Sequence, residues 1–286
     1  MAMTDALKTS TKNTWCPGCG NFGILTALKR ALVKLKLDPS RTVIVTGIGC
    51  HGKMADYVRT NSFYGIHGRV LPAATGIKLA NHDLKVIGFA GDGDAYAIGF
   101  GHFAHAARRN IDITYIVHNN MVFGLTTGQT APTSQRGYRS KTHPQGVPEL
   151  PLNPVAEALA SNASLVARAF SGDMPYLTEI MVQGIQHRGF AFIDVFQPCV
   201  TFNRVNTYDF FRQRVYKLED VGHDPTDKVE AWRKAQEWGE KIPIGVFYKE
   251  TRPVYSEGIP AIGTEPLIKS PLVAAEKIDG MIRSLT

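Results

Sequence analysis

The sequence predicts an α/β fold in which a mostly parallel sheet is covered by helices on both faces. Two apolar runs rich in β-branched residues, 86–90 and 113–117, have the composition of buried parallel strands. The segment between them is rich in Ala, Gly and aromatic residues, and it predicts the crossover helix of a βαβ unit. With 286 residues, 44% of them hydrophobic, the chain can bury a full core as one large domain, or as one domain and an extension.

The other elements follow from local signals. After a short polar arm over residues 1–13, apolar residues at helical spacing predict a helix from Gly20 to Leu37, and Asp38-Pro39-Ser40 ends it. The further strands and helices expected in the core are, in chain order, strand 42–46, helix 72–81, helix 154–162, strand 165–169, helix 175–188 and strand 190–196. Residues 121–153 predict a long loop, and a loop of that length inside a compact domain is usually functional.

The pattern changes beyond about residue 205, where an aromatic and basic segment begins. We expect an amphipathic helix near 227–241, one short strand at 245–248 and a helix at 271–284. This region is too small and irregular for an independent domain. We therefore assign residues 1–205 to the core domain and residues 206–286 to a C-terminal extension that packs on the core or on a partner subunit.

Composition favours anionic small molecules or an acidic protein partner over nucleic acid. The formal charge is +7 and the pI is near 9.2, but the Lys and Arg residues are scattered and form no nucleic-acid recognition motif. A moderate positive field suits anionic small molecules or an acidic protein partner. No apolar run is long enough to span a membrane, and the N-terminus lacks the apolar core of a signal peptide, so we expect a cytoplasmic protein.

Polar residues follow two neighbouring strands of the predicted sheet. The sequence GDGD occupies 91–94, and NN occupies 119–120. Because ligands bind at the carboxyl ends of strands in open α/β sheets, Asp92 and Asn120 are expected in one crevice. A carboxylate, a carboxamide and a backbone carbonyl form the oxygen shell that Mg²⁺ prefers, usually shared with phosphates. The pattern resembles the diphosphate-binding motif of thiamine diphosphate (TPP) enzymes; a β-turn followed by an Asn-rich loop is the alternative.

The four cysteines form a second constellation. Cys16 and Cys19 make a CxxC, Cys50 follows the strand at 42–46, and Cys199 follows the strand at 190–196. Four thiolates can hold structural zinc, hold an iron–sulfur cluster, or remain unrelated core thiols. Zinc sites usually pair two CxxC units and only one is present, so the wide separation of the ligands favours a [4Fe-4S] cluster.

Seven segments together carry a specific resemblance. They are WCPGCGNFG, GIGCHGK, HGR, ATGIKLAN, GDGDAYAIGFGHFAHAARRN, HNNMVFGLTTGQTAPTS and DVFQPCVTFN. In this order they resemble the β subunit of the 2-oxoacid:ferredoxin oxidoreductases, and the resemblance covers roughly residues 13–215. It implies that residues 1–205 form a TPP pyrophosphate-binding domain that carries the cluster cysteines.

The resemblance also implies the site residues. Cys16, Cys19, Cys50 and Cys199 would ligate a [4Fe-4S] cluster. Asp92, Asn120 and the backbone carbonyl of Val122 would bind Mg²⁺. The residues implied to line the TPP site are Ile48, Gly49, Cys50, His51, His67, Gly93, Asp94, Gly124 and Leu125.

The implied activity is the CoA-dependent oxidative decarboxylation of 2-oxoacids such as pyruvate and 2-oxoglutarate to acyl-CoA and CO2, with electrons passing through the cluster to ferredoxin. Lys53 is a candidate to pair with the substrate carboxylate, and Leu125 a candidate to bound the side-chain pocket. A solvated surface lysine and a core leucine are the alternatives. His67 is a candidate donor to a phosphate.

One pyrophosphate-type unit is present, and no second βα set of comparable size accompanies it. TPP also needs a carboxylate on its aminopyrimidine, which in this superfamily comes from a second domain. We therefore expect the chain to need an α (or fused γα) subunit. Two other function classes stay open: a non-redox TPP-dependent decarboxylase subunit, which has no use for four convergent cysteines, and a zinc-binding interaction protein.

Overall fold

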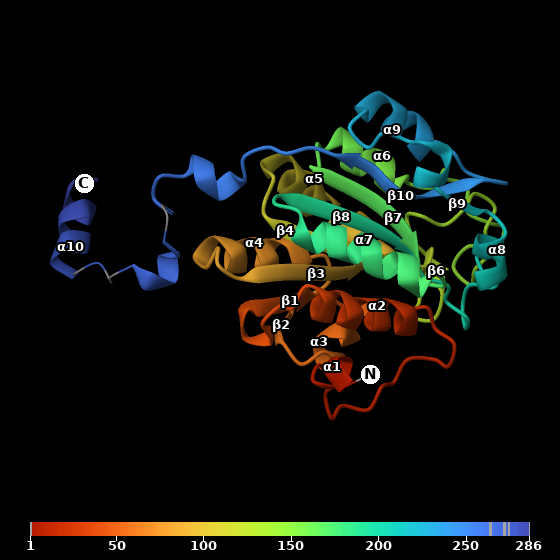
Figure 1. Ribbon diagram of the computed structural model, residues 1–286, viewed down its shortest axis with the longest axis horizontal. Helices are drawn as coiled ribbons and strands as arrows, with labels where there is room; N and C mark the ends of the chain where they lie inside the picture. The colour runs from red at the N-terminus through yellow and green to blue at the C-terminus, as the bar shows by residue number, and fades with distance from the viewer. Residues whose placement is uncertain (1, 263–264, 271–272, 274, 286) are drawn as a thin grey trace.

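The computed structural model describes residues 2–262, 265–270, 273 and 275–285, and an eight-stranded sheet runs through its centre (Figure 1). The strand order is β2-β1-β3-β4-β8-β7-β10-β9. The strands are β1 (Thr42–Thr46), β2 (Asn61–Tyr64), β3 (Lys85–Gly91), β4 (Ile113–Asn119), β7 (Leu165–Phe170), β8 (Phe190–Phe196), β9 (Val215–Lys217) and β10 (Ile242–Lys249). All neighbouring strands are parallel except β10, which runs antiparallel to β7. The predicted α/β class with a mostly parallel sheet is confirmed.

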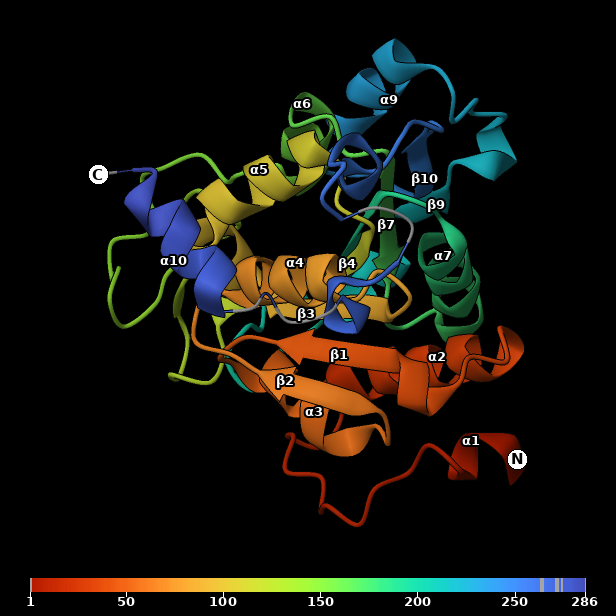
Figure 2. The same ribbon diagram turned by 90° about the vertical axis from the view of Figure 1, so that its left-hand side faces the viewer.

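Helices cover both faces of this sheet (Figure 2). One face packs against α2 (Asn21–Lys34), α3 (Met54–Tyr57) and α7 (Met174–Gln186); the other packs against α4 (Val70–Ala80), α5 (Phe100–Arg109), α6 (Pro154–Ala160) and α9 (Lys228–Ala235). Side chains alternate between the two cores along each strand, as the pleat requires: Val43 and Val45 join one, and Ile44 joins the other. Because both faces are buried, these strands are apolar throughout, which is why the sequence marks them clearly.

Capping side chains explain several helix starts. The Asn153 side chain accepts a hydrogen bond from Ala156 N at the start of α6, and Asp173 does the same for Tyr176 N at the start of α7. A proline occupies the first turn of each helix. Helix α2 ends at Lys34, before the predicted Leu37, because the backbone at Lys36 is left-handed with φ of 52°.

Two regions differ from the expectation. The stretch between Lys53 and the helix predicted at 72–81, for which the sequence predicts no strand or helix, contains α3 and the edge strand β2. Strand β2 is exposed along its whole length, so it lacks the apolar signal of its buried neighbours. In the C-terminal part, the one short strand expected at 245–248 is the longer β10, and β9 adds a second strand to the same sheet. Helix α9 is shorter than the predicted helix at 227–241.

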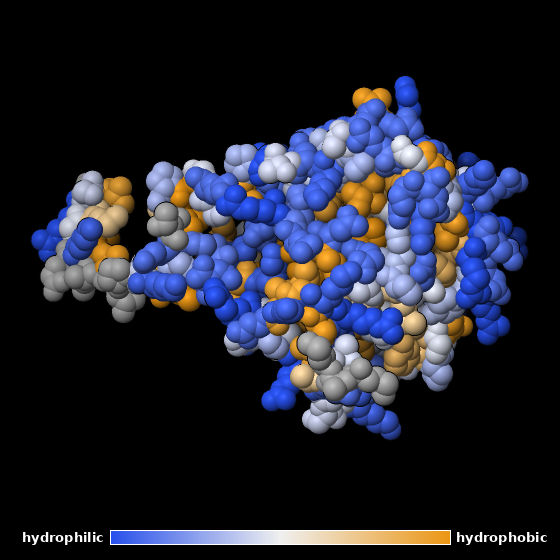
Figure 3. Space-filling model, in the orientation of Figure 1, coloured by the Kyte–Doolittle hydropathy of each residue, from blue (hydrophilic) through white to orange (hydrophobic). Residues whose placement is uncertain are grey.

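The remaining α-helices and strands are α1 (Ala2–Asp5), α8 (Tyr208–Arg212), the small hairpin of β5 (Val122–Phe123) with β6 (Gln129–Thr130), and α10 (Ala275–Arg283). The helix predicted at 271–284 corresponds to α10, while residues 271, 272 and 274 lie outside the described residues. Helix α10 lies apart from the body of the molecule, with hydrophobic side chains on its surface (Figures 1 and 3). Over the described part of the chain, no helix has the length and apolar character needed to cross a membrane.

Candidate active site

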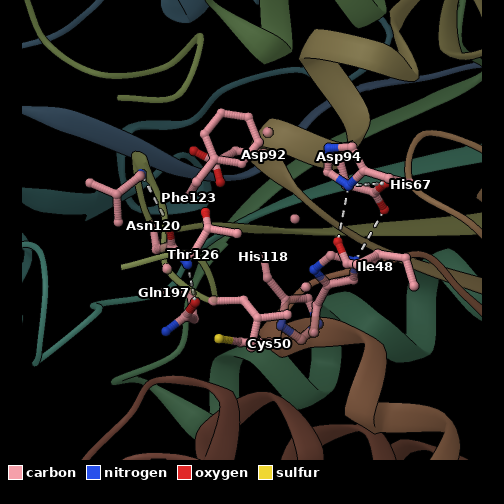
Figure 4. A pocket seen from close by; sticks show the side chains of 17 residues that line it. Ile48, Cys50, His67, Asp92, Asp94, His118, Asn120, Phe123, Thr126 and Gln197 are labelled. Atoms are coloured by element: carbon pink, nitrogen blue, oxygen red, sulfur yellow. Dashed lines mark hydrogen bonds and ion pairs between the residues drawn. The ribbon is translucent and has the colours of Figure 1, made fainter. Parts of the chain in front are cut away.

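A pocket of about 280 Å³ lies where β1, β3 and β4 end and the chain enters the following loops (Figure 4). This is the edge of a parallel sheet at which ligands usually bind. The structure gathers there all the residues that the sequence associates with TPP and Mg²⁺: Ile48, Gly49, Cys50, His51, His67, Asp92, Gly93, Asp94, Asn120, Val122, Gly124 and Leu125. The wall also includes Gly91 of the GDGD motif, and four residues that the sequence did not indicate, namely His118, Phe123, Thr126 and Gln197.

Asp94 ties together three separate segments of the pocket wall. Its Oδ2 lies 3.0 Å from Nε2 of His51, and its Oδ1 lies 3.2 Å from Nδ1 of His67. The backbone N–H of Gly68 donates to the same Oδ1. His67 is further held by a contact of 3.1 Å between its Nδ1 and the carbonyl oxygen of Ile48. The buried Asp94 carboxylate therefore fixes the orientation of both imidazole rings.

Glycines without side chains lie next to His51 and Asp94 and leave room for them. A Cβ at Gly91 would stand 2.8 Å from Nδ1 of His51, and a Cβ at Gly47 would collide with the Asp94 carboxylate. Gly49 has φ of 153°, a conformation that other residues rarely adopt, and its missing side chain also leaves room for the His51 ring. Glycine is thus needed at these positions to let a histidine and a carboxylate approach the strand ends.

Asp92 presents a buried carboxylate, with 1% of the residue exposed. The hydroxyl Oγ1 of Thr133 donates to its Oδ2 at 2.6 Å. Burial raises the pKa of Asp92 to about 7, against the lowering effect of hydrogen bonds from Thr133 and from the backbone of Gly93. A bound cation would compensate this buried charge, so the position fits a metal ligand.

The side chain of Asn120 is held in one orientation. Its Nδ2 donates to Oε1 of Gln197 at 2.9 Å, and its Oδ1 accepts from the backbone N–H of Val122 at 3.1 Å. A carbonyl oxygen has two lone pairs, so Oδ1 keeps one for a cation. Thr133 and Gln197 were not predicted. Gln197 directly follows the strand at 190–196, which is a usable signal, whereas Thr133 reaches Asp92 only through the tertiary path of the 121–153 loop.

The four cysteines line one adjacent cavity of about 180 Å³. Cys16 is exposed, Cys50 is half-buried, and Cys19 and Cys199 are buried. Burial, with the other three thiols nearby, raises the pKa of Cys19 to about 12, and burial raises that of Cys50 to about 11. Among the residues that the structure describes, no three His, Cys, Asp or Glu side chains are grouped closely enough for a single metal ion. The four cysteines are thus brought together as lining residues of one cavity.

The two cavities share part of their wall. Cys50, Asn120, Gly124, Leu125 and Gln197 border both. A Cβ at Gly124 would lie 3.6 Å from Sγ of Cys199 and 3.8 Å from Sγ of Cys50, so the backbone at this residue passes directly between thiols and pocket. Gln197 Nε2 also contacts Sγ of Cys19 at 3.3 Å. The pocket at the strand ends and the cavity lined by the cysteines are therefore direct neighbours.

Lys53 and Leu125 both border the thiol-lined cavity. The Lys53 side chain is 42% exposed, and its Nζ lies 3.8 Å from the Asp56 carboxylate, a separation typical of a weak surface ion pair. Leu125 is 55% exposed and lines both cavities, so the expected alternative of a core leucine does not apply.

Comparison with known proteins agrees with this geometry. Residues 47–195 match the family model described as "Thiamine pyrophosphate enzyme, C-terminal TPP binding domain", and residues 199–263 match the model for the C-terminal part of the pyruvate ferredoxin oxidoreductase beta subunit. The chain is 49% identical over 253 residues to 2-oxoacid:ferredoxin oxidoreductase 1, subunit beta, of Aeropyrum pernix, covering 84% of this chain and 79% of the relative. It is 47% identical over 249 residues to 2-oxoacid:ferredoxin oxidoreductase subunit beta of Saccharolobus solfataricus, covering 83% of this chain and 82% of the relative.

A solved structure is similar over nearly the whole length. It is a 2-oxoglutarate:ferredoxin oxidoreductase from Magnetococcus marinus, described with 2-oxoglutarate, coenzyme A and succinyl-CoA bound. The superposition has a TM-score of 0.90 at 37% identity and covers 97% of this chain and 95% of the matched chain.

Proposed function

Because the chain belongs to the family of 2-oxoacid:ferredoxin oxidoreductase β subunits, we propose that it binds Mg²⁺-TPP and a [4Fe-4S] cluster and supports the CoA-dependent oxidative decarboxylation of 2-oxoacids. Electrons then pass to ferredoxin, and the acyl group passes to coenzyme A. The observation that carries this proposal is the wall shared by the pocket at the strand ends and the cavity lined by four thiols. Such a wall suits an enzyme that must move electrons from one cofactor to another.

The donor set of the first pocket fits a cation and a diphosphate. Asp92 would supply a carboxylate oxygen, Asn120 its Oδ1, and Val122 its backbone carbonyl, which together form an all-oxygen set of the kind that Mg²⁺ prefers. Thr133 and Gln197 hold the first two side chains through hydrogen bonds of 2.6 and 2.9 Å. When bound, TPP supplies the electron sink for decarboxylation. The chain's own task is to hold and orient the diphosphate end.

The second cavity fits a cluster better than a single zinc ion. A zinc ion draws four sulfur atoms to about 2.3 Å from one point, whereas a cluster fills a space between its four cysteines. Cys16, Cys19, Cys50 and Cys199 all line one space of about 180 Å³. Free thiols of this kind also suit the reducing interior of the cell, and we propose a cytoplasmic location.

We further propose that an α subunit, separate or fused, completes the site. Within the described residues that line the pocket, the carboxylates are those of Asp92 and Asp94, and both are engaged inside the chain. The aminopyrimidine carboxylate is therefore assigned to the partner. We keep residues 206–286 as a proposed C-terminal extension: its strands β9 and β10 continue the edge of the sheet beyond β7, and we propose that the exposed Ile278, Met281 and Ile282 of α10 offer an apolar stripe to the partner.

We propose Lys53 and Leu125 as substrate contacts at the mouth of the site. Leu125 borders both cavities and is free to meet a substrate side chain, and Lys53 carries a cation near the thiols and the loop at Gly124. Pyruvate and 2-oxoglutarate are the proposed substrates. Both carry the carboxylate that a lysine attracts as a point charge.

Anaerobic co-expression with the partner subunit tests the proposal. The purified complex is expected to be brown, to contain four irons and four sulfides for each β chain, and to reduce ferredoxin or viologen with 2-oxoacid and CoA. Omission of TPP or CoA should stop the reaction. A colourless but active decarboxylase would support the non-redox alternative, and one zinc without any effect of TPP on the melting temperature would support the interaction protein.

A further inference from the structure

The side chain of Gln197 borders both the pocket at the strand ends and the cavity lined by the cysteines (Figure 4). Gln197 is 1% exposed, and its backbone N–H donates to the carbonyl oxygen of Asn119 at 2.9 Å. This bond continues the pairing of β8 with β4 one residue past the end of β8. The sheet therefore holds Gln197 at the place where the two cavities meet.

Both polar atoms of the Gln197 amide have partners, and the partners belong to different sites. Oε1 accepts a hydrogen bond from Nδ2 of Asn120, a proposed Mg²⁺ ligand, at 2.9 Å. Nε2 donates to the carbonyl oxygen of Pro198 at 2.9 Å and to Sγ of Cys19, a proposed cluster ligand, at 3.3 Å. An amide nitrogen carries two hydrogens, so one N–H is available for each of these acceptors.

Backbone groups at the two ends of this network fix its direction. The N–H of Val122 donates to Oδ1 of Asn120 at 3.1 Å, so the nitrogen of Asn120 must face Gln197. At the other end the carbonyl oxygen of Pro198 can only accept. A flipped Gln197 amide would place oxygen against oxygen at Pro198 and nitrogen against nitrogen at Asn120. The network therefore requires that Gln197 presents an N–H, and not its oxygen, to the sulfur of Cys19.

The glycine that follows Cys19 allows this close approach. A Cβ at Gly20 would stand 2.9 Å from Cγ of Gln197. The backbone N–H of Gly20 also donates to the carbonyl oxygen of Pro198 at 3.1 Å. The Pro198 carbonyl thus keeps a donor when Gln197 is replaced, so a substitution at Gln197 leaves this contact between the CxxC segment and the strand end in place.

We propose that Gln197 is a positioning residue for both cofactors: it orients Asn120 toward the cation and donates a hydrogen bond to the Cys19 sulfur when that sulfur ligates the cluster. This inference rests on the proposed function and adds a residue that is neither a metal ligand nor a cluster ligand. Hydrogen bonds to the ligating sulfurs tune the reduction potential of a cluster. Because reduction adds negative charge and an N–H stabilises negative charge on sulfur, Gln197 raises that potential.

The test uses the anaerobically purified complex with the partner subunit and the variant Gln197→Met, which keeps the length of the side chain and removes its donor and acceptor. The midpoint potential of the cluster is measured by an EPR-monitored redox titration without TPP or added metal. We expect Gln197→Met to shift the one-electron reduction equilibrium about 10-fold toward the oxidised cluster, which equals a potential lower by about 59 mV. Mn²⁺ affinity at saturating TPP, measured by EPR, should fall about 10-fold or more, because Asn120 loses the group that orients it.

Two further variants separate the two roles of Gln197. Thr133→Val removes the hydrogen bond to Asp92 on the far side of the metal site, and Thr133 does not line the cysteine cavity. It should weaken Mn²⁺ and leave the cluster potential unchanged. Gln197→Glu keeps an oxygen that can accept from Asn120, so it should weaken Mn²⁺ by no more than about 3-fold.

A measurement on the unsubstituted complex keeps the proposal testable if Gln197→Met does not fold. Among the described residues that line the cysteine cavity, Gln197 is the only glutamine. Protein labelled with glutamine that carries ¹⁵N in its side-chain amide should therefore show a ¹⁵N coupling to the reduced cluster in pulsed EPR. No such coupling would refute the hydrogen bond to the sulfur.

Four other results would overturn the inference. An unchanged potential in Gln197→Met would show that its N–H does not act on the cluster. An equal shift of the potential in Thr133→Val would show that the shift is not specific to Gln197. Gln197→Glu that loses Mn²⁺ as severely as Gln197→Met would refute the role of Oε1. A wild-type complex without a cluster would overturn the proposed function as well, whereas the first three results would leave it standing.

Discussion

Removing the hydrogen bond from Thr133 to Asp92 tests the proposed metal site without changing any of the proposed metal ligands. Thr133→Val keeps the size and branching of the side chain and removes only its hydroxyl. Thr133 is 3% exposed and Asp92 is 1% exposed, so no bulk water replaces the lost donor at 2.6 Å from Oδ2. The Asp92 carboxylate then loses the group that fixes its orientation toward the pocket.

The expected loss follows from the type of bond. A hydrogen bond to a charged group contributes about 1.5–3 kcal/mol, and loss of an outer-shell partner of a metal ligand typically costs about 10–100-fold in metal affinity. We therefore expect Thr133→Val to weaken the binding of Mn²⁺, used as a Mg²⁺ substitute visible by EPR, about 10–100-fold at saturating TPP. Iron content and the visible spectrum of the cluster should not change, because Thr133 lines neither the thiol cavity nor its wall.

Two controls separate this effect from general loss of packing. Thr133→Ser restores the hydroxyl and should recover Mn²⁺ affinity to within about 3-fold of the wild type. Thr178→Val removes a similarly buried hydroxyl, bonded at 2.7 Å to Met174 O within α7, and should leave Mn²⁺ affinity unaffected. If Thr133→Val binds Mn²⁺ as tightly as the wild type while it remains folded, Thr133 does not orient the metal ligand and the argument fails.

Three further predictions concern the rest of the site and the core. Gly47→Ala should abolish TPP binding, since its Cβ would collide with the Asp94 carboxylate; wild-type TPP affinity in a calorimetric titration would contradict this. Cys50→Ala should lose iron and activity, whereas Asp92→Ala should lose Mg²⁺-TPP and keep the iron signal; loss of TPP alone in both variants would refute the cluster assignment. Burial lowers the pKa of His187 to about 4, so between pH 6.5 and 4 the unfolded chain binds the extra proton and stability falls on acidification. His187→Gln should reduce that fall by about 1–3 kcal/mol in urea unfolding at pH 7 and pH 4.5, and an unchanged difference between the two pH values would exclude His187 as a source.

The sequence by itself determined the central strands of this protein and the edge of the sheet at which its motifs meet. The strands at 42–46, 86–90 and 113–117 are buried on both faces, so their apolar composition alone identifies them. Parallel topology then brings their carboxyl ends to one edge, so the GDGD and NN motifs could be assigned to one pocket from the order of the strands alone. The edge strand β2 and the strand β9 were not predicted, because neither is buried enough to have a clear apolar pattern.

Only the tertiary structure decided which side chains complete the two sites. Thr133 meets Asp92 across 41 positions of sequence, and no local pattern encodes that contact. Gln197 can be placed at the same edge of the sheet from its position after a strand, but its bond to Asn120, 77 positions away, is set by the fold. The wall at Gly124 between the thiols and the pocket likewise depends on how separate loops fold over the sheet. Local propensity and the spacing of apolar residues determine the strands and helices. The hydrogen-bond partner of a buried polar group depends on the whole chain, because the group must pair with whichever donor or acceptor the fold places beside it.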